Sequence, residues 1–142
     1  MLRRLISLIM VLLIGLPTGA FASDSNLSID AEKILGKYDG LFEVYIQANR
    51  LLKYDYSVTI FKFDAEKREV SLKTRCDGCE NKTSTLSGCK ITDTTAGLSF
   101  SCNGEGWHVD YHLDGEHLKA NGVSKKGNPF TVSVKKVQQL DN

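Results

Sequence analysis

The sequence has no long hydrophobic run and almost no net charge, and each shortage argues against a class of protein. The apolar run from Leu5 to Leu16 is about a dozen residues, too short to cross a membrane core of ~30 Å. The 18 basic and 17 acidic residues are interspersed, so no basic face is available to neutralise the phosphates of nucleic acid. Nor is there a basic amphipathic helix that would lie on a membrane. We expect neither nucleic acid nor a membrane among the partners of the mature protein.

Catalytic and cofactor motifs are also missing. No G-x-S-x-G turn presents a serine nucleophile, and no G-x-x-x-x-G-K-[ST] or G-x-G-x-x-G loop opens a helix to bind phosphate. Most carboxylates fall in turns, where contact with solvent accounts for them. We therefore predict that the protein is not an enzyme and has no cofactor.

The beginning of the chain has the pattern of a secretory signal peptide. A basic start at Arg3 and Arg4 precedes the apolar run, and Ala20-Phe21-Ala22 has the small residues of a cleavage site. We predict cleavage after Ala22 and a periplasmic or secreted location. No cysteine lies near this point, which argues against a lipid anchor.

Cleavage would leave about 120 residues, the size of one domain with one core. It would remove two basic residues and no acidic one, so the net charge becomes about −1. We predict a signal peptide over 1–22, an N-terminal segment with a short helix over 23–36, and a single β-barrel domain over 37–142. We expect the mature protein to be a monomer.

All four cysteines, which are Cys76, Cys79, Cys89 and Cys102, belong to the mature part. An even number in a small exported chain is typical of two disulfides. A zinc site usually has two close pairs, and here only the pair in CDGC is close. A redox role for CDGC normally needs a helix N-terminus that lowers one thiol pKa, whereas this motif follows a strand and contains a turn signal. We predict structural disulfides.

One short helix and eight strands are expected. SIDAEKILG, from Ser28 to Gly36, has a capping serine and a glycine suited to a left-handed stop. Beyond it the apolar residues follow a period of two, with turn signals every eight to twelve residues, as in an all-β sandwich or barrel. The predicted strands cover 40–46, 55–63, 68–76, 84–91, 96–102, 107–113, 117–123 and 129–137.

The turns of the second half predict how the strands pair. Asp114-Gly115 as a two-residue turn pairs Tyr111 with Leu118. The turn Lys125-Lys126-Gly127 sets Gly122 against Phe130.

Two earlier turns extend the pattern. Asn103-Gly104-Glu105-Gly106 places Cys102 beside Trp107, and the 94–97 turn places Cys89 opposite Cys102. These registers gather the apolar residues on one face, and a one-residue slip would reverse a strand's faces. They favour the pairing Cys89–Cys102 with Cys76–Cys79, and the nested pairing 76–102 with 79–89 stays open as the alternative.

Short sequential connections favour an antiparallel up-and-down meander closed into a barrel, which removes exposed strand edges. An open sheet or sandwich is the alternative. The strand YSVTIFKF has apolar residues on both faces, so we expect the short helix to cover its outer face, at Phe61 and Phe63.

The pentapeptide Gly36-Lys37-Tyr38-Asp39-Gly40 resembles the glycine-x-aromatic opening of the first strand in lipocalin-like (calycin) barrels, with Tyr38 where the family usually has Trp. The preceding helical segment and the eight-strand meander are similar too. The resemblance implies a lipocalin-like barrel that holds a small apolar ligand in a cup.

Phe100, Trp107, Tyr111 and Phe130 share the inward face and are the candidate ligand-binding residues. An eight-stranded barrel is just wide enough to be filled by its own side chains or to hold one small ligand. We therefore predict an exported binding module with a small apolar ligand. The alternative is a secreted protein-interaction module, an inhibitor or accessory subunit, with a solid core and a protein partner. Gln47–Lys53, with Leu51 and Leu52, is expected to be an exposed loop, either a lid over the cup or a partner contact.

All three histidines lie in WHVDYHLDGEH, and their positions predict that they point outward. The two-residue turn would place His117 directly opposite His112, close enough for both imidazoles to clamp one transition-metal ion. Two exposed ligands make an incomplete shell, and no second group is evident to orient the rings. A solvated outer face without a metal is therefore the favoured interpretation.

Overall fold

The computed structural model describes residues 29–141, so the predicted signal peptide lies outside the described residues. The protein is an all-β, eight-stranded antiparallel barrel with up-and-down order and one short helix. Its elements are α1 (Ala31–Ile34), β1 (Gly36–Ile46), a 3-10 turn η1 (Gln47–Asn49), β2 (Arg50–Asp64), β3 (Glu69–Asp77), β4 (Thr83–Asp93), β5 (Leu98–Gly104), β6 (Trp107–Asp114), β7 (His117–Val123) and β8 (Pro129–Gln139). β1 pairs with β8 and closes the barrel, which confirms the predicted fold class. At the level of the fold, this architecture is consistent with a lipocalin-like barrel.

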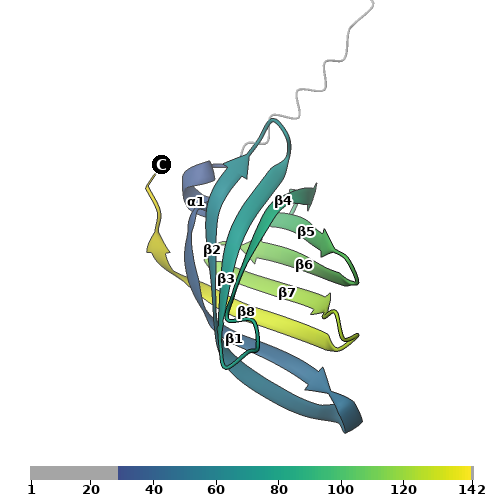
Figure 1. The fold of residues 1–142 in the computed structure, drawn as a ribbon. Helices are drawn as coiled ribbons and strands as arrows, with labels where there is room; N and C mark the ends of the chain where they lie inside the picture. The colour runs from purple at the N-terminus through teal and green to yellow at the C-terminus, as the bar shows by residue number, and fades with distance from the viewer. Residues whose placement is uncertain (1–28, 142) are drawn as a thin grey trace, which may run out of the picture.

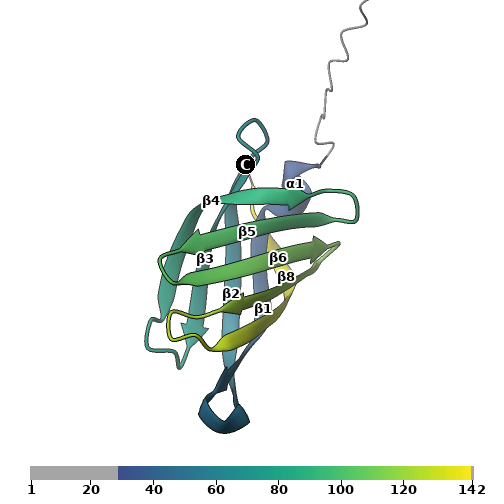
Figure 2. The ribbon, with the colours of Figure 1, turned by 90° about the vertical axis from the view of Figure 1, so that its right-hand side faces the viewer.

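The two halves of the barrel wall cross steeply. Figure 2 shows β5–β8 running across the view in front of β1–β3. Figure 1 shows α1 and the end of β8 at one end of the barrel and the β1–β2 tip at the other. We call these the helix end and the mouth.

The predicted inward face forms the core. Phe100 and Leu118 are fully buried, and Val132 and Val134 are nearly so. Along β6 burial alternates residue by residue, as the period-two pattern requires. The inward face predicted from the hairpins is therefore confirmed.

The helix end is closed by α1 and Tyr38. Asp30, and not the predicted Ser28, is the N-cap of α1, and its side chain accepts a hydrogen bond from the Glu32 amide at 3.1 Å. Gly36 is not a left-handed helix stop, because it already belongs to β1. The Tyr38 hydroxyl donates a hydrogen bond to the Ile34 carbonyl at 2.8 Å, which ties the helix to the first strand.

The expectation that the helix covers the outer face of β2 was wrong. Ile34 and Leu35 pack into the core at the helix end, and Phe61 remains 46% exposed. The pairing of β2 with β3 is interrupted by a bulge between Ile60 and Lys62. The bulge changes which residues face inward, so Phe63 packs against the core. Apolar residues on both nominal faces therefore mark a bulge here and not a covered face.

The segment Gln47–Lys53 is not a loop, which corrects a second expectation. Only Gln47–Asn49 turns, and Leu51 and Leu52 belong to β2, where they pair with Tyr45 and Val44. Both leucines are half-buried. The β1–β2 hairpin thus extends as a two-stranded ribbon beyond the last pairs with β8 and β3.

Candidate functional site

A cavity of about 540 Å³ lies at the mouth. It is bounded by β2, β3 and β4 on one side, by β6 and β8 on the other, and by two mouth loops. We call it the cup, and its lining residues are Tyr56, Thr74, Asn81, Ser84, Thr85, Leu86, Trp107, Val109, Tyr111, Val123, Ser124, Lys125, Lys126 and Phe130.

Three of the four predicted cup residues line this cavity, namely Trp107, Tyr111 and Phe130. Phe100 does not line it, because it is fully buried beneath Tyr111 with the two rings stacked at 4.9 Å. The part of the barrel between the cup and the helix end is thus filled by the protein's own side chains. The cup is shallow and lies in the mouth.

The position of Trp107 differs from the prediction. It pairs with Gly104, and Cys102 pairs with Val109, so the β5–β6 register is offset by two residues from the predicted one. A side chain at Gly104 would collide with the indole, so the glycine makes room for Trp107. Trp107 is half-buried, and it shares a cavity with Cys89 and Cys102.

The sequence analysis missed an aromatic cluster beside the cup. Phe42 of β1 lies 5.1 Å from Phe130 and 5.3 Å from Tyr56, ring centre to ring centre, and 6.3 Å from Tyr54. Aromatic pairs at such separations stabilise beyond the area they bury. Phe42 pairs with Tyr54, and Tyr56 follows two residues further along β2 on the same face, so a register for the first hairpin would have revealed this part of the cluster.

Tyr56 and Tyr111 bring polar hydroxyls into the cup. Burial raises the pKa of Tyr111 well above its usual value, and the neighbouring Tyr56 raises it further. Burial also raises the pKa of Tyr56, and hydrogen bonding with Thr74 and Tyr111 offsets part of that rise. At neutral pH both hydroxyls are therefore uncharged groups that can donate or accept a hydrogen bond.

The buried tyrosines predict a loss of stability in alkali. Burial, with Glu116 nearby, raises the pKa of Tyr38 to about 12, and the pKa of Tyr56 and of Tyr111 is raised too. Unfolded tyrosines lose their protons near pH 10, so above that pH the unfolded chain binds fewer protons than the folded one. The free energy of unfolding should fall as the pH rises from about 10 toward 12. Urea titrations across this range test it, and a stability that stays flat would contradict the burial of these hydroxyls.

Both disulfides form as predicted, Cys76–Cys79 and Cys89–Cys102. The nested alternative is excluded. Cys89–Cys102 joins β4 to β5, with Cα atoms 4.5 Å apart, and Cys76–Cys79 closes the start of the β3–β4 loop. Two disulfides are compatible with an extracellular or periplasmic location.

The predicted pairing of the histidines was wrong. His112 pairs with Lys119, and His117 pairs with Asp114, because Gly115-Glu116 and not Asp114-Gly115 is the centre of the turn. His112 Nδ1 lies 2.8 Å from the Ser99 hydroxyl. The described part of the chain contains no cluster of three or more His, Cys, Asp or Glu residues suited to a metal.

His108 belongs to a second polar group on the same outer face. Its Nε2 lies 2.7 Å from an Asp110 carboxylate oxygen, and Ser101 donates to the other oxygen. The Ser101 hydrogen bond does most to lower the pKa of Asp110; burial opposes it, and the hydrogen bond and charge of His108 lower the pKa further. These contacts account for the polar residues of WHVDYHLDGEH as a hydrogen-bonded outer surface.

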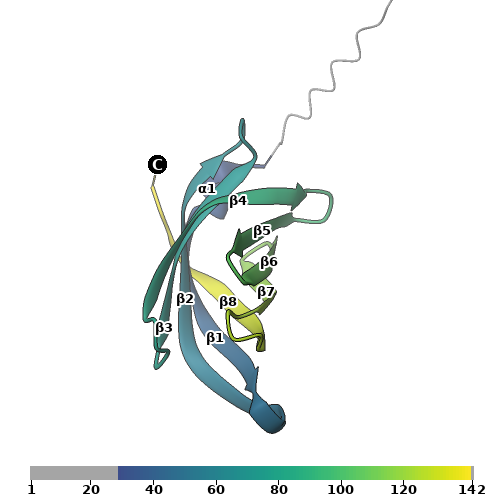
Figure 3. The same cartoon turned by 45° about the vertical axis from the view of Figure 1, so that its right-hand side comes forward.

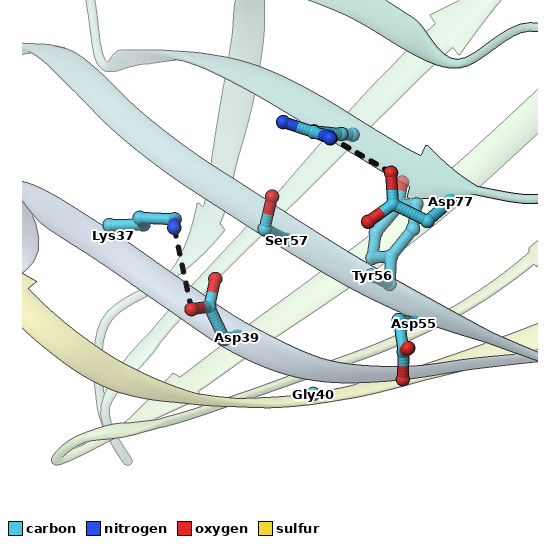
Figure 4. Close-up of a pocket in the computed structure, with 8 residues that line it drawn as sticks. Lys37, Asp39, Gly40, Asp55, Tyr56, Ser57 and Asp77 are labelled. Carbon is cyan, nitrogen blue, oxygen red and sulfur yellow. Dashed lines mark hydrogen bonds and ion pairs between the residues drawn. The ribbon is translucent and has the colours of Figure 1, made fainter.

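A shallow charged groove crosses the outer face of β1–β3 (Figure 4). Lys37 pairs with Asp39 at 3.4 Å, and Arg75 pairs with Asp77 at 3.0 Å. All four side chains are well exposed, so each pair contributes little to stability.

Within the described residues, none of the helices is both long and apolar enough to traverse a membrane. No protein-family model, no curated protein and no solved structure matches the chain. The geometry of the cup and of its surroundings therefore carries the functional argument.

Proposed function

We propose that this protein is an exported, non-enzymatic binding protein that holds one small apolar ligand in the cup. The observation that carries the proposal is the cavity of about 540 Å³ at the mouth, with Trp107, Tyr111 and Phe130 in its wall. Cavities of roughly 300–1,000 Å³ with aromatic walls and a few polar groups are typical of small-molecule sites. The signal-peptide pattern over 1–22 and the two disulfides support export.

The polar lining indicates how such a ligand is oriented. The hydroxyls of Tyr56, Thr74 and Tyr111 lie close together among the residues that line the cup, and Lys125 and Lys126 lie on the β7–β8 loop at the rim. A ligand with an apolar body would contact the aromatic wall and place its polar group either at the hydroxyls or at the rim lysines. No histidine or carboxylate is among the residues that line the cup, so its hydroxyls have no general base there. This supports binding and not catalysis.

Titration with the uncharged apolar fluorophore N-phenyl-1-naphthylamine tests the proposal. We expect saturable binding of one fluorophore per protein. Trp107→Ala and Phe130→Ala should each weaken it about fivefold, because each removes an aromatic contact worth about 1 kcal/mol. Trp107 and Phe130 are only half-buried, so both variants should fold.

Phe61→Ala is the matched control, because Phe61 is an exposed aromatic residue of β2 that does not line the cup. Its affinity should equal that of the unmodified protein. Non-saturable binding, or an equal loss in all three variants, would overturn the cup as the site.

A further inference from the structure

The barrel wall is split between β4 and β5. Only three residue pairs join these strands, from Lys90 with Ser101 to Asp93 with Ser99. In the described structure, Thr83–Leu86 pairs with β3 alone, and Cys102–Gly104 pairs with β6 alone. Figure 3 shows β4 following β3 over its first part and reaching β5 only toward its end.

A kink at Gly88 produces the split. Gly88 has φ +67°, a conformation that favours glycine, and the β3–β4 pairing shifts register between Val70 and Leu72. The Gly88 amide donates to the Ser71 hydroxyl at 3.3 Å. The Cys89–Cys102 disulfide stands directly next to the last strand pair, so it fixes the point at which the two strands separate.

The separated strands border a second cavity of about 300 Å³. We call it the β4–β5 slot, and its lining residues are Thr85, Leu86, Ser87, Gly88, Cys89, Lys90, Ser101, Cys102, Asn103 and Trp107. Thr85, Leu86 and Trp107 line the cup as well, so the slot opens into the side of the cup.

The side of β4 that faces the slot is a free strand edge. In an antiparallel pair about half of a strand's backbone N–H and C=O groups point to its partner, so the others in Thr83–Leu86 point away from β3. Natural edge strands are usually protected by charged residues or proline. The sequence Thr-Ser-Thr-Leu-Ser has neither. The edge is therefore suited to pair with another strand.

The charged side chains that line the slot and the cup are lysines, and two of the three are neutralised by glutamates just outside the lining. The charged lining residues are Lys90, Lys125 and Lys126, and no carboxylate is among the lining residues of either cavity. Lys90 pairs with Glu69, and Lys126 pairs with Glu80 at 3.6 Å. Lys125 makes no ion pair within the described residues. The unpaired ammonium of Lys125 at the rim favours an acidic partner.

We propose that the β4–β5 slot binds an acidic, extended peptide segment, which adds as a strand to the free edge of β4. Five or six residues would pair over about 20 Å. Alternate side chains of the added strand would point toward Leu86 and the cup, and the others toward solvent. A small ligand in the cup does not use this backbone edge, so the inference is independent of the proposed function.

Selection from a displayed library of ten-residue, cysteine-free peptides on the oxidised protein tests this. Enriched peptides should be acidic with alternating apolar residues. On binding, backbone amides within Thr83–Gly88 should become protected from hydrogen exchange. N-methylation along an enriched peptide should weaken binding at every second residue, because only alternate amides face the β4 edge.

Charge variants give the matched comparison. Lys125→Glu should weaken binding of an enriched peptide about tenfold, while Lys119→Glu, an exposed change on the outer face of β7, should leave it unchanged. The proposal fails if no peptide is enriched, if both variants bind alike, or if the protected amides lie outside Thr83–Gly88. A dimer of the purified protein whose Thr83–Gly88 amides are already protected would also overturn it, because a second copy would then occupy the edge.

Discussion

Replacing Tyr38 by alanine is expected to lower the free energy of unfolding by about 3–5 kcal/mol, the usual cost of removing a large buried aromatic side chain. Tyr38 has no exposed surface, and its ring lies under the Lys136 ammonium, with Nζ 5.7 Å from the ring centre. The same ammonium donates to the Lys33 carbonyl at 2.7 Å. Removing Tyr38 therefore takes away the hydrogen bond to Ile34 and the ring beneath Lys136, which are two of the contacts that tie α1 to β1 and β8.

Urea unfolding of three variants measures this effect. Tyr38→Phe keeps the ring and loses only the hydrogen bond to Ile34, so it should cost about 1 kcal/mol. Tyr45→Ala, at an exposed tyrosine of the same strand, should be nearly neutral. If Tyr38→Ala were no more destabilising than Tyr45→Ala, the helix end would not be closed by this residue.

Removing the Cys89–Cys102 disulfide is expected to cost about 3 kcal/mol, because it closes a loop with a sequence separation of 13. Cys76–Cys79 has a separation of 3, so the Cys76→Ala/Cys79→Ala variant should lose about 2 kcal/mol or less. The comparison uses Cys89→Ala/Cys102→Ala, and alanine replaces cysteine in both pairs because Cys76, Cys89 and Cys102 are buried.

The loss of stability without the Cys89–Cys102 disulfide should be accompanied by faster amide exchange in β4 and β5. Without the disulfide at the point of separation, only three residue pairs resist opening of the wall, so amide exchange should accelerate over Ile91 and Phe100. Equal losses in the two double variants, with unchanged exchange at β4 and β5, would contradict the role given to Cys89–Cys102.

The sequence predicted the strands and their faces because a period of two is a strong signal. The predicted turn between β6 and β7 was misplaced by one residue, and the reason is physical. Asp-Gly marks a turn without saying which two residues are central, and here Gly115 takes the first central position with φ +59°, as a type II′ turn requires. The resulting shift of two residues keeps every face and changes every partner, so the core prediction held while the His112–His117 pair did not.

The cup was predictable only in part. Trp107, Tyr111 and Phe130 follow from alternation on β6 and β8, but the depth of the cup depends on how Phe100 and Tyr111 stack across strands. The split beside it depends on one backbone angle at Gly88, which leaves no periodic trace in the sequence. The bulges at Gly88 and Phe61 depend on tertiary packing, and the alternation of apolar and polar residues does not reveal them.

The central claim is that the cup at the mouth is a binding site with Trp107 in its wall. Trp107 is the only tryptophan, so tryptophan emission reports on this residue alone. Iodide quenching of that emission, with and without saturating N-phenyl-1-naphthylamine, is the most direct measurement. We predict partial quenching of the free protein, as suits a half-buried indole, and clear protection once the fluorophore is bound. Identical quenching in the two conditions would contradict the claim, because the ligand would then lie away from Trp107.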